Sequence, residues 1–255
     1  RGFYISTTSM LSQQVKLENI SNNIANQNTA GYKREETIFR SFRDELLLRT
    51  GNPLAGAEGV PSRTVAVPVG TLAQGVGVEE IHTVHLPGTL EETGRPWDFA
   101  LVGDGFFALQ TETGVRYTRD GHFSLDANRY LVDAQGNYLL GQNGPIQLED
   151  GELILEENGA LTVDGHFVDN LLIVNFPAEQ LSKEGFNSYA ALAGAVPLEF
   201  EGLVMQGYLE QSNVDLTREM SSLIRIRRSY EAAQKLAQAY DQLLANGANE
   251  LGVLR

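Results

Sequence analysis

The histidines are the first place to look for chemistry in this chain, and their spacing argues against it. His82 and His85 lie three residues apart, but positions three apart in a strand point to opposite faces, so the two rings would not share a metal ion. His122 and His166 each follow a turn glycine, where a solvated loop histidine is the usual case. We therefore expect neither a metal nor a cofactor.

Catalytic carboxylates and nucleophiles have equally little support. Adjacent acidic pairs could supply the two carboxylates of a glycosidase in principle, but in strands or turns they are far more often surface charge: Glu79-Glu80, Glu91-Glu92 and Glu156-Glu157. The G-x-G segments at 75–77 and 103–105 lack the further glycines and the strand-to-helix context of a nucleotide site. The sequence contains no G-x-S-x-G elbow and no cysteine, which excludes a cysteine nucleophile, thiolate ligands and disulfides. These residues predict a protein that is not an enzyme.

Charge and hydropathy narrow the choice of partners. A chain of 255 residues can bury a real core, and its net charge of −14 argues against nucleic acid or an anionic membrane as the main partner. One basic cluster lies among acidic residues near the C-terminus and predicts a salt-bridged helix face: Arg225, Arg227 and Arg228. No stretch is long and apolar enough for direct membrane insertion, and the first residues lack the apolar run of a cleavable signal peptide.

The elements that position these residues begin with a long helix over the last forty residues. One apolar column repeats every seven residues, a second fills the i+3 positions, and Met220 lies beside them: Leu216, Leu223, Tyr230, Ala237, Leu244 and Leu251, then Ile226, Ala233 and Tyr240. This pattern predicts an amphipathic α-helix with a sustained seam, and no proline interrupts it. Ser212 and Asp215 are suitable residues to cap its start.

A second heptad pattern occupies the N-terminus. Its column is Phe3, Met10, Leu17 and Ile24, with Leu11, Val15 and Ile20 beside it. We expect this helix to end near Gly31, since glycine is a natural helix terminator. Two such helices at the ends of one chain predict a coiled-coil stem that carries a domain. The alternative is two core helices of an ordinary globular domain.

The remaining positions of the first helix are mostly uncharged amides and hydroxyls. Asparagine favours helix less than the Lys and Glu of a water-facing helix. A polar face rich in Asn therefore suggests that other chains meet it and hydrogen-bond to it, with Asn23, Asn26 and Thr29 shaping the end of the helix.

Between the helices the pattern changes twice. Phe39, Phe42 and Leu46 fall at helical spacing within residues 32–50, which predicts a short second helix that Gly51-Asn52-Pro53 stops. Short apolar runs between glycine turns then predict strands at 99–102, 106–110, 115–118, 123–125, 130–132, 138–140, 153–155, 161–163 and 171–176. Segment 120–131 matches segment 150–161 thirty residues on, which predicts two similar β-hairpins.

Together these patterns predict an α+β chain in which long N- and C-terminal α-helices form a coiled-coil stem beside a central all-β domain. The predicted parts are a helical stem with the second short helix at 1–50, a flexible connector at 51–64, the β-domain at 65–206 and the C-terminal stem at 207–255.

Three blocks resemble the bacterial flagellar axial proteins, specifically the basal-body rod and hook-basal-body family of the distal-rod type. Segment 17–33, which ends Asn-Gln-Asn-Thr-Ala-Gly-Tyr-Lys, is similar to the N-terminal rod motif N-N-x-A-N-x-x-T-x-G-[FY]-K. Segments 97–107 and 117–123 resemble the central block, and segments 207–216 and 228–235 resemble the C-terminal motif. Two positions depart from the family: Asn128-Arg129 replaces a common Gly, which suggests a differently shaped turn, and Ala233 replaces a common Asn.

The resemblance implies a structural rod subunit whose terminal helices pack with those of neighbours into a tubular drive shaft that transmits torque and encloses the export channel. Implied partners are copies of itself, other rod and hook proteins and the flagellar type III export apparatus. The implied location is the basal body, outside the cytoplasmic membrane. The candidate assembly interface comprises Phe3, Met10, Leu17, Ile20, Asn23, Ile24, Asn26, Thr29, Gly31, Leu216, Met220, Leu223, Ile226, Tyr230, Ala233, Ala237, Tyr240 and Leu244.

Two alternative functions remain open at this point. Within the same class, the chain could be a hook or hook-adaptor subunit. In a different class, it could be a secreted β-domain that binds or cleaves wall glycan, with helices that serve only oligomerisation.

Overall fold

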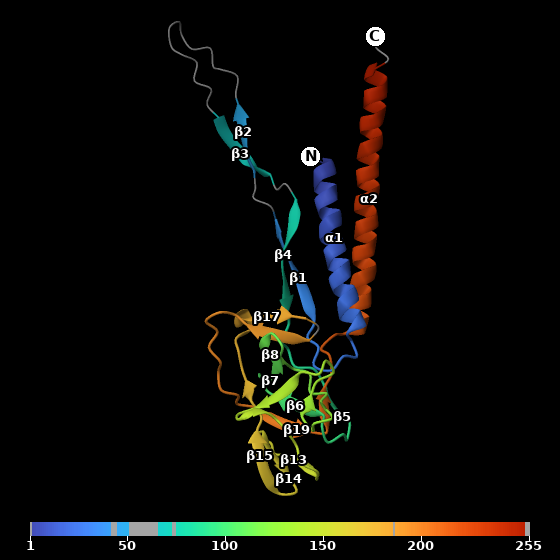
Figure 1. Cartoon of the computed structure of the whole chain (residues 1–255). Helices are drawn as coiled ribbons and strands as arrows, with labels where there is room; N and C mark the ends of the chain where they lie inside the picture. Colours follow the sequence, from blue (N-terminus) through green and yellow to red (C-terminus); the bar gives the residue numbers. More distant parts are fainter. Residues whose placement is uncertain (1, 42–44, 51–65, 73–74, 186, 253–255) are drawn as a thin grey trace, which may run out of the picture. The chain divides into compact units, whose positions relative to one another are not determined.

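The computed structural model describes residues 2–41, 45–50, 66–72, 75–185 and 187–252 (Figure 1). Contacts divide the chain into two units. The first, here the helical unit, comprises residues 1–21, 36–82 and 220–255. The second, here the β-rich unit, comprises residues 22–35 and 83–219.

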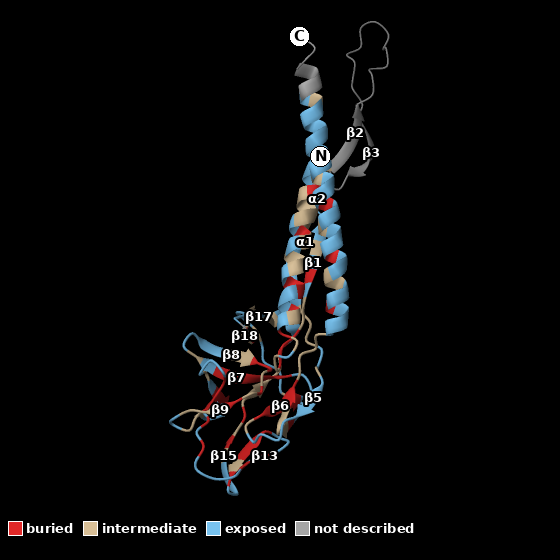
Figure 2. Cartoon of the chain, turned by 90° about the vertical axis from the view of Figure 1, so that its right-hand side faces the viewer, coloured by how far each residue is buried: buried red, intermediate tan, exposed pale blue. Residues whose placement is uncertain are grey.

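The helical unit is built around two long helices, α1 (Gly2–Ala25) and α2 (Leu216–Gly252). Both views show the two helices side by side and running in opposite directions, and Gly2 lies against the ring of Tyr240 (Figures 1 and 2). Asp215 caps the start of α2 as predicted, because its carboxylate accepts a hydrogen bond from the Arg218 amide at 3.1 Å. The first helix ends at Ala25, which is earlier than the expected end near Gly31.

Two β-ribbons complete the helical unit and overturn one prediction. Strand β1 (Glu35–Ser41) pairs with β4 (Val76–Thr83), and β2 (Glu45–Thr50) pairs with β3 (Ala66–Leu72). The short helix predicted within residues 32–50 is therefore wrong. Thr37, Ile38 and Phe39 are β-branched or aromatic and alternate in burial, so cross-strand pairing prevails over the helical spacing of the aromatic residues.

The predicted domain boundaries meet the two units only in part. Strands β3 and β4 lie within residues 65–206, yet they group with the helical unit because their pairing partners are β2 and β1. The predicted flexible connector at 51–64 lies outside the described residues.

The β-rich unit contains one large antiparallel sheet and several small ones. The large sheet follows the order β17-β18-β8-β7-β11-β10-β9, with β12 paired to β11 and β16 to β7. Strands β13, β14 and β15 form a three-stranded sheet, while β6 pairs with β19 and β5 with β20. The bounds are β5 Leu90–Glu92, β6 Phe99–Val102, β7 Phe106–Thr111, β8 Gly114–Thr118, β9 Ser124–Leu125, β10 Leu131–Val132, β11 Tyr138–Gly141, β12 Gly144–Pro145, β13 Leu153–Leu155, β14 Ala160–Val163, β15 His166–Asn170, β16 Ile173–Val174, a 3-10 turn at Ala178–Gln180, β17 Leu181–Glu184, β18 Ser188–Ala191, β19 Leu203–Gln206 and β20 Tyr208–Glu210.

These strands enclose an aromatic and aliphatic core of their own. The rings of Phe99 and Phe107 each pack on Phe123, with centroids 5.7 and 5.4 Å away. Leucines from β10, β11 and β14 complete the buried cluster. The predicted strands from 99 to 163 are confirmed, and all of these runs except 115–118 supply side chains to this core. The predicted run at 171–176 shortens to β16.

The internal repeat is confirmed as two hairpins with equivalent pairing. The pairs are Leu125 with Leu131 and Leu155 with Leu161. Arg129 occupies the left-handed conformation at φ 67°, as Gly159 does at φ 88° in the second hairpin. Arg129 thus adopts the backbone conformation of a turn glycine, while the difference from the turn of the family stays a prediction. Its guanidinium offsets the strain by donating to the carbonyls of residues 148 and 149, at 2.8 and 2.6 Å.

Candidate functional site

The predicted seam of α2 divides into a covered column and an open one. Ile226 and Ala233 are both 7% exposed, so the chain itself covers them. Leu223, Tyr230 and Ala237 are half-buried. Four predicted positions are open to solvent: Leu216, Met220, Tyr240 and Leu244. Figure 2 shows the exposed face of α2.

The apolar column of α1 is open at its start and partly covered farther along. Phe3 is 51% exposed, Met10, Leu17 and Ile24 are half-buried, and Ile20 is fully buried. Three neighbours outside the candidate interface widen the open face: Tyr4 and Ile5, which the sequence analysis missed, and Leu11, which it placed beside the column. Their large apolar side chains on a solvent-facing helix were the available signal.

The buried face of α1 is polar, and the chain itself covers it. Ser12 donates from Oγ to the carbonyl of Val76 in β4 at 2.9 Å. Asn23 donates from Nδ2 to the Glu35 carbonyl at 2.9 Å, while its Oδ1 accepts from the Tyr32 hydroxyl and the Glu35 amide, both at 3.0 Å. For Ser12 and Asn23 these partners lie within the chain, and a contact of this face with other chains stays a prediction. Their polar groups are satisfied within one molecule, which leaves the apolar face as the open one.

The turn after α1 carries the three other predicted polar positions. Asn26 donates from Nδ2 to the Asn22 carbonyl at 2.9 Å, and Thr29 donates to Asn26 Oδ1 at 3.3 Å. Gly31 adopts φ 66°, and its amide donates to the Glu210 carbonyl at 2.7 Å. Asn26 and Thr29 shape the end of the helix as predicted, whereas Gly31 lies beyond it. A contact with another subunit stays a prediction for each of them.

The histidines occupy separate environments. His82 is exposed, whereas His85 packs on the rings of Phe106 and Tyr189 at 5.7 and 5.4 Å. His122 is solvated as expected, with a side chain that is 41% exposed, but its Nδ1 also lies 3.1 Å from a carboxylate oxygen of the buried Asp98. Within the described part of the chain, no group of three or more His, Asp or Glu side chains could hold a metal ion.

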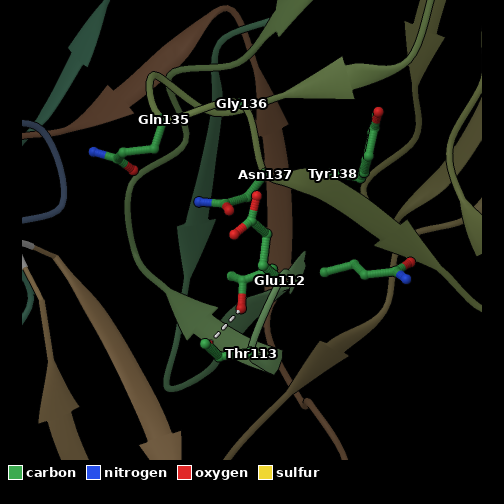
Figure 3. A pocket seen from close by; sticks show the side chains of 8 residues that line it. Glu112, Thr113, Gln135, Gly136, Asn137 and Tyr138 are labelled. Carbon is green, nitrogen blue, oxygen red and sulfur yellow. Dashed lines mark hydrogen bonds between the residues drawn. The ribbon is translucent and has the colours of Figure 1, made fainter.

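Two surface pockets of the β-rich unit differ in the carboxylates that line them. One pocket lies between the turns at 110–113 and 135–138, and Glu112 is the single carboxylate among its lining residues (Figure 3). A second pocket is lined by three carboxylates, and all three are exposed surface groups: Asp104, Glu199 and Glu201.

The basic cluster of α2 is only partly salt-bridged. Arg227 lies 3.3 Å from Glu231 one turn later, as predicted. For Arg225 and Arg228, both exposed, the described residues provide no ion pair. None of the described helices is long and apolar enough to span a membrane.

Comparison with known proteins identifies the family. Residues 3–33 match the model "Flagella basal body rod protein", residues 100–165 match "Flagellar hook protein FlgE/F/G D1 domain", and residues 205–251 match "Flagellar basal body rod FlgEFG protein C-terminal". Over 98% of both chains, the sequence is 31% identical to the flagellar basal-body rod protein FlgG of Bacillus subtilis. It is 30% identical to the flagellar hook-basal body complex protein FlhO of the same organism, over 99% of this chain and 98% of that protein. Identity to FlgG of Agrobacterium fabrum is 34%, over 95% of this chain and 96% of the relative. The chain therefore belongs to the flagellar basal-body rod protein family.

Proposed function

We propose that this chain builds the rod by packing the open apolar faces of α1 and α2 against neighbouring subunits. It is a structural subunit of the flagellar basal-body rod, not an enzyme, and its place is the basal body in the cell envelope. The proposal adds the mechanism, which is a coiled-coil stem completed by copies of the same chain and by other axial proteins.

The observation that carries the proposal is the division of each helix into a satisfied face and an open face. The Ser and Asn face of α1 is hydrogen-bonded within the chain, and Ile226 and Ala233 of α2 are covered. Large apolar side chains remain open on both helices, from Phe3 and Leu11 to Leu236 and Leu244. A row of exposed apolar residues on paired helices marks a surface for other helices.

A contact of this kind grows without closing. Neighbours in a rod present different faces to each other, and a head-to-tail contact that repeats by rotation and translation generates a helical tube. Covering each large side chain completely contributes about 1.5–3 kcal/mol, so a handful per subunit is enough to drive assembly. Such a tube transmits torque along its length and encloses a channel for export. Delivery of the subunit by the flagellar type III apparatus belongs to the same proposal.

The test is growth of the intact protein with concentration. Negative-stain electron microscopy and light scattering on a dilution series should show tubes above a critical concentration. Leu223→Asp places a charge in the seam and should abolish the tubes. Far-UV circular dichroism is the control, since the strands of the β-rich unit should remain folded. A chain that stays monomeric at every concentration contradicts the proposal, and so does a Leu223→Asp variant that still forms tubes.

A second candidate, a hook or hook-adaptor subunit, has one observation in its favour. The family model that matches residues 100–165 is described as a hook protein domain. Mixed assembly decides between the two, because a rod subunit should add to preformed rods and a hook subunit to preformed hooks.

A further inference from the structure

Three charged side chains meet in the interior of the β-rich unit, and each comes from a different part of the chain. Lys33, Arg119 and Glu210 are between 1% and 4% exposed. Lys33 follows α1, Arg119 follows β8, and Glu210 ends β20 shortly before α2. They fall within the three segments that match the family models, one in each segment.

Glu210 is the centre of this triad. Lys33 donates from Nζ to Glu210 Oε1 at 2.5 Å, and the Gly88 amide donates to the same oxygen at 2.8 Å. Arg119 lies 3.3 Å from the other oxygen, Oε2. Each carboxylate oxygen therefore contacts a cationic side chain, and this pairing offsets the free-energy cost of burying the charge.

The two cations extend the triad into the surrounding backbone. Lys33 also donates to the Leu86 carbonyl at 2.9 Å. Arg119 donates to the carbonyls of Leu101 and Gly103 beside β6, and its guanidinium stacks 5.6 Å from the centre of the Phe106 ring. Each charged group thus holds a stretch of main chain as well as its partner.

Backbone contacts around the triad tie the same segments together. The Gly31 amide donates to the Glu210 carbonyl at 2.7 Å, and the Arg34 amide donates to Asn213 Oδ1 at 2.7 Å. A Cβ at Gly31 would overlap the backbone of Arg119. Segment 26–35, which leaves α1, and segment 207–215, which enters α2, are therefore fixed to each other and to the strands.

Stability alone does not explain a buried triad. The cost of removing charges from water offsets much of their attraction, so well-packed apolar side chains would stabilise the interior about as well. What the charges provide is a single arrangement, because any shift of one segment leaves a buried charge unpaired.

We propose that Glu210 is a positioning residue, which holds the segments leading out of α1 and into α2 in the one arrangement that rod assembly requires. The proposal rests on the proposed function, since it concerns how the helix ends are held for contact with sister subunits. Glu210 itself is buried within the chain, so its effect on assembly is indirect.

The test compares two variants that each exchange a buried carboxylate for an amide. Glu210→Gln removes the charge that both cations share. Asp169→Asn is the matched control, because Asp169 in β15 is buried and accepts hydrogen bonds from Asn143 and Asn170, but touches neither segment. Amide hydrogen exchange is read at Gly31 and Gly88, and assembly is read as the critical concentration of the intact protein.

We expect Glu210→Gln to speed exchange at Gly88 and Gly31 and to raise the critical concentration, each on the order of tenfold. Amides of the core strands β7 and β11 should stay protected in both variants. Asp169→Asn should assemble like the wild type. Normal assembly of Glu210→Gln overturns the inference, and so does an equal loss of assembly in Asp169→Asn, which would reduce the effect to general instability.

A second variant keeps the test decisive if Glu210→Gln does not fold. Replacing Lys33, Arg119 and Glu210 together by Met removes every charge of the triad while keeping long side chains. This protein should melt cooperatively yet assemble poorly, and normal assembly overturns the inference. If the wild type never assembles, the proposed function is refuted. Amide hydrogen exchange at Gly31 in Glu210→Gln then still shows whether Glu210 holds segments 26–35 and 207–215 together.

Discussion

Leu244 offers the sharpest test of the open face of α2. It lies in the predicted seam and is 68% exposed, so it contributes little to the fold of a single chain. Leu244→Gln removes the apolar side chain and keeps a residue of similar helix propensity. The free energy of unfolding of the monomer should change by less than about 0.5 kcal/mol.

The cost in the assembly is much larger. Burying a leucine completely contributes about 1.5–3 kcal/mol, so covering the exposed two-thirds of Leu244 contributes about 1–2 kcal/mol to each contact. Since about 1.4 kcal/mol is a factor of ten in an equilibrium constant, the critical concentration should rise by roughly 5-fold to 30-fold.

The assay is sedimentation of assembled protein over a concentration series, with urea unfolding of the dilute monomer measured in parallel. Gln242→Ala, an exposed polar position on the same turn of α2, is the matched control and should leave both measurements unchanged. The reasoning is refuted if Leu244→Gln assembles at the wild-type concentration. It is also refuted if the variant loses monomer stability, because Leu244 would then be part of the fold of the single chain.

Three further outcomes follow from the described contacts. Asn23→Ala removes three hydrogen bonds from a fully buried site, so urea unfolding should show a loss of about 2–4 kcal/mol. Gly31→Ala would place a side chain in a left-handed conformation and against neighbouring backbone atoms. The conformation alone costs about 1 kcal/mol, so with the overlap the free energy of unfolding should fall by more than this, which lowers the melting temperature. A variant as stable as the wild type would contradict this. Burial raises the pKa of Asp120 to about 6, so the folded protein keeps a proton that the unfolded chain releases near pH 4. Stability therefore falls as the pH rises from about 4 to about 6. In denaturation measured across pH, Asp120→Asn should be as stable as the wild type below about pH 4 and more stable by about 1–3 kcal/mol at pH 7.

The strands predicted between residues 99 and 163 could be recognised because short apolar runs and turn residues alternate along the local sequence. Most of these apolar runs lie beside a turn glycine, and all except 115–118 supply side chains to one core. The internal repeat could be predicted for the same reason, because Leu125 and Leu155 each precede their hairpin turn by the same number of residues. The helix prediction for residues 32–50 was wrong because the spacing of Phe39, Phe42 and Leu46 matches a helix by coincidence. The strand pairing that decides the structure depends on residues 76–83, which are distant in sequence.

The triad could not be found from the sequence. Lys33 and Glu210 are 177 positions apart, and Arg119 is 91 positions before Glu210. A single Lys, Arg or Glu carries no local signal that it is buried, because these residues are exposed in most proteins. The one indication was that each of the three residues lies inside a block that resembles the rod family. Such a resemblance does not show that the three side chains contact each other.

The seven-residue repeat of α2 shows why periodicity alone cannot identify an assembly surface. Ile226 and Leu244 belong to the same pattern, yet the first is covered within the chain and the second is open. A helix that contacts both its own chain and its neighbours needs apolar side chains on two faces, and both faces repeat every seven residues. The sequence therefore identifies the apolar residues of the repeat, and only their exposed fractions in the structure show which of them are buried within the single chain. Variants of the seam should accordingly divide into two classes: Ile226→Ala should weaken the monomer, whereas Leu244→Gln should weaken only the rod.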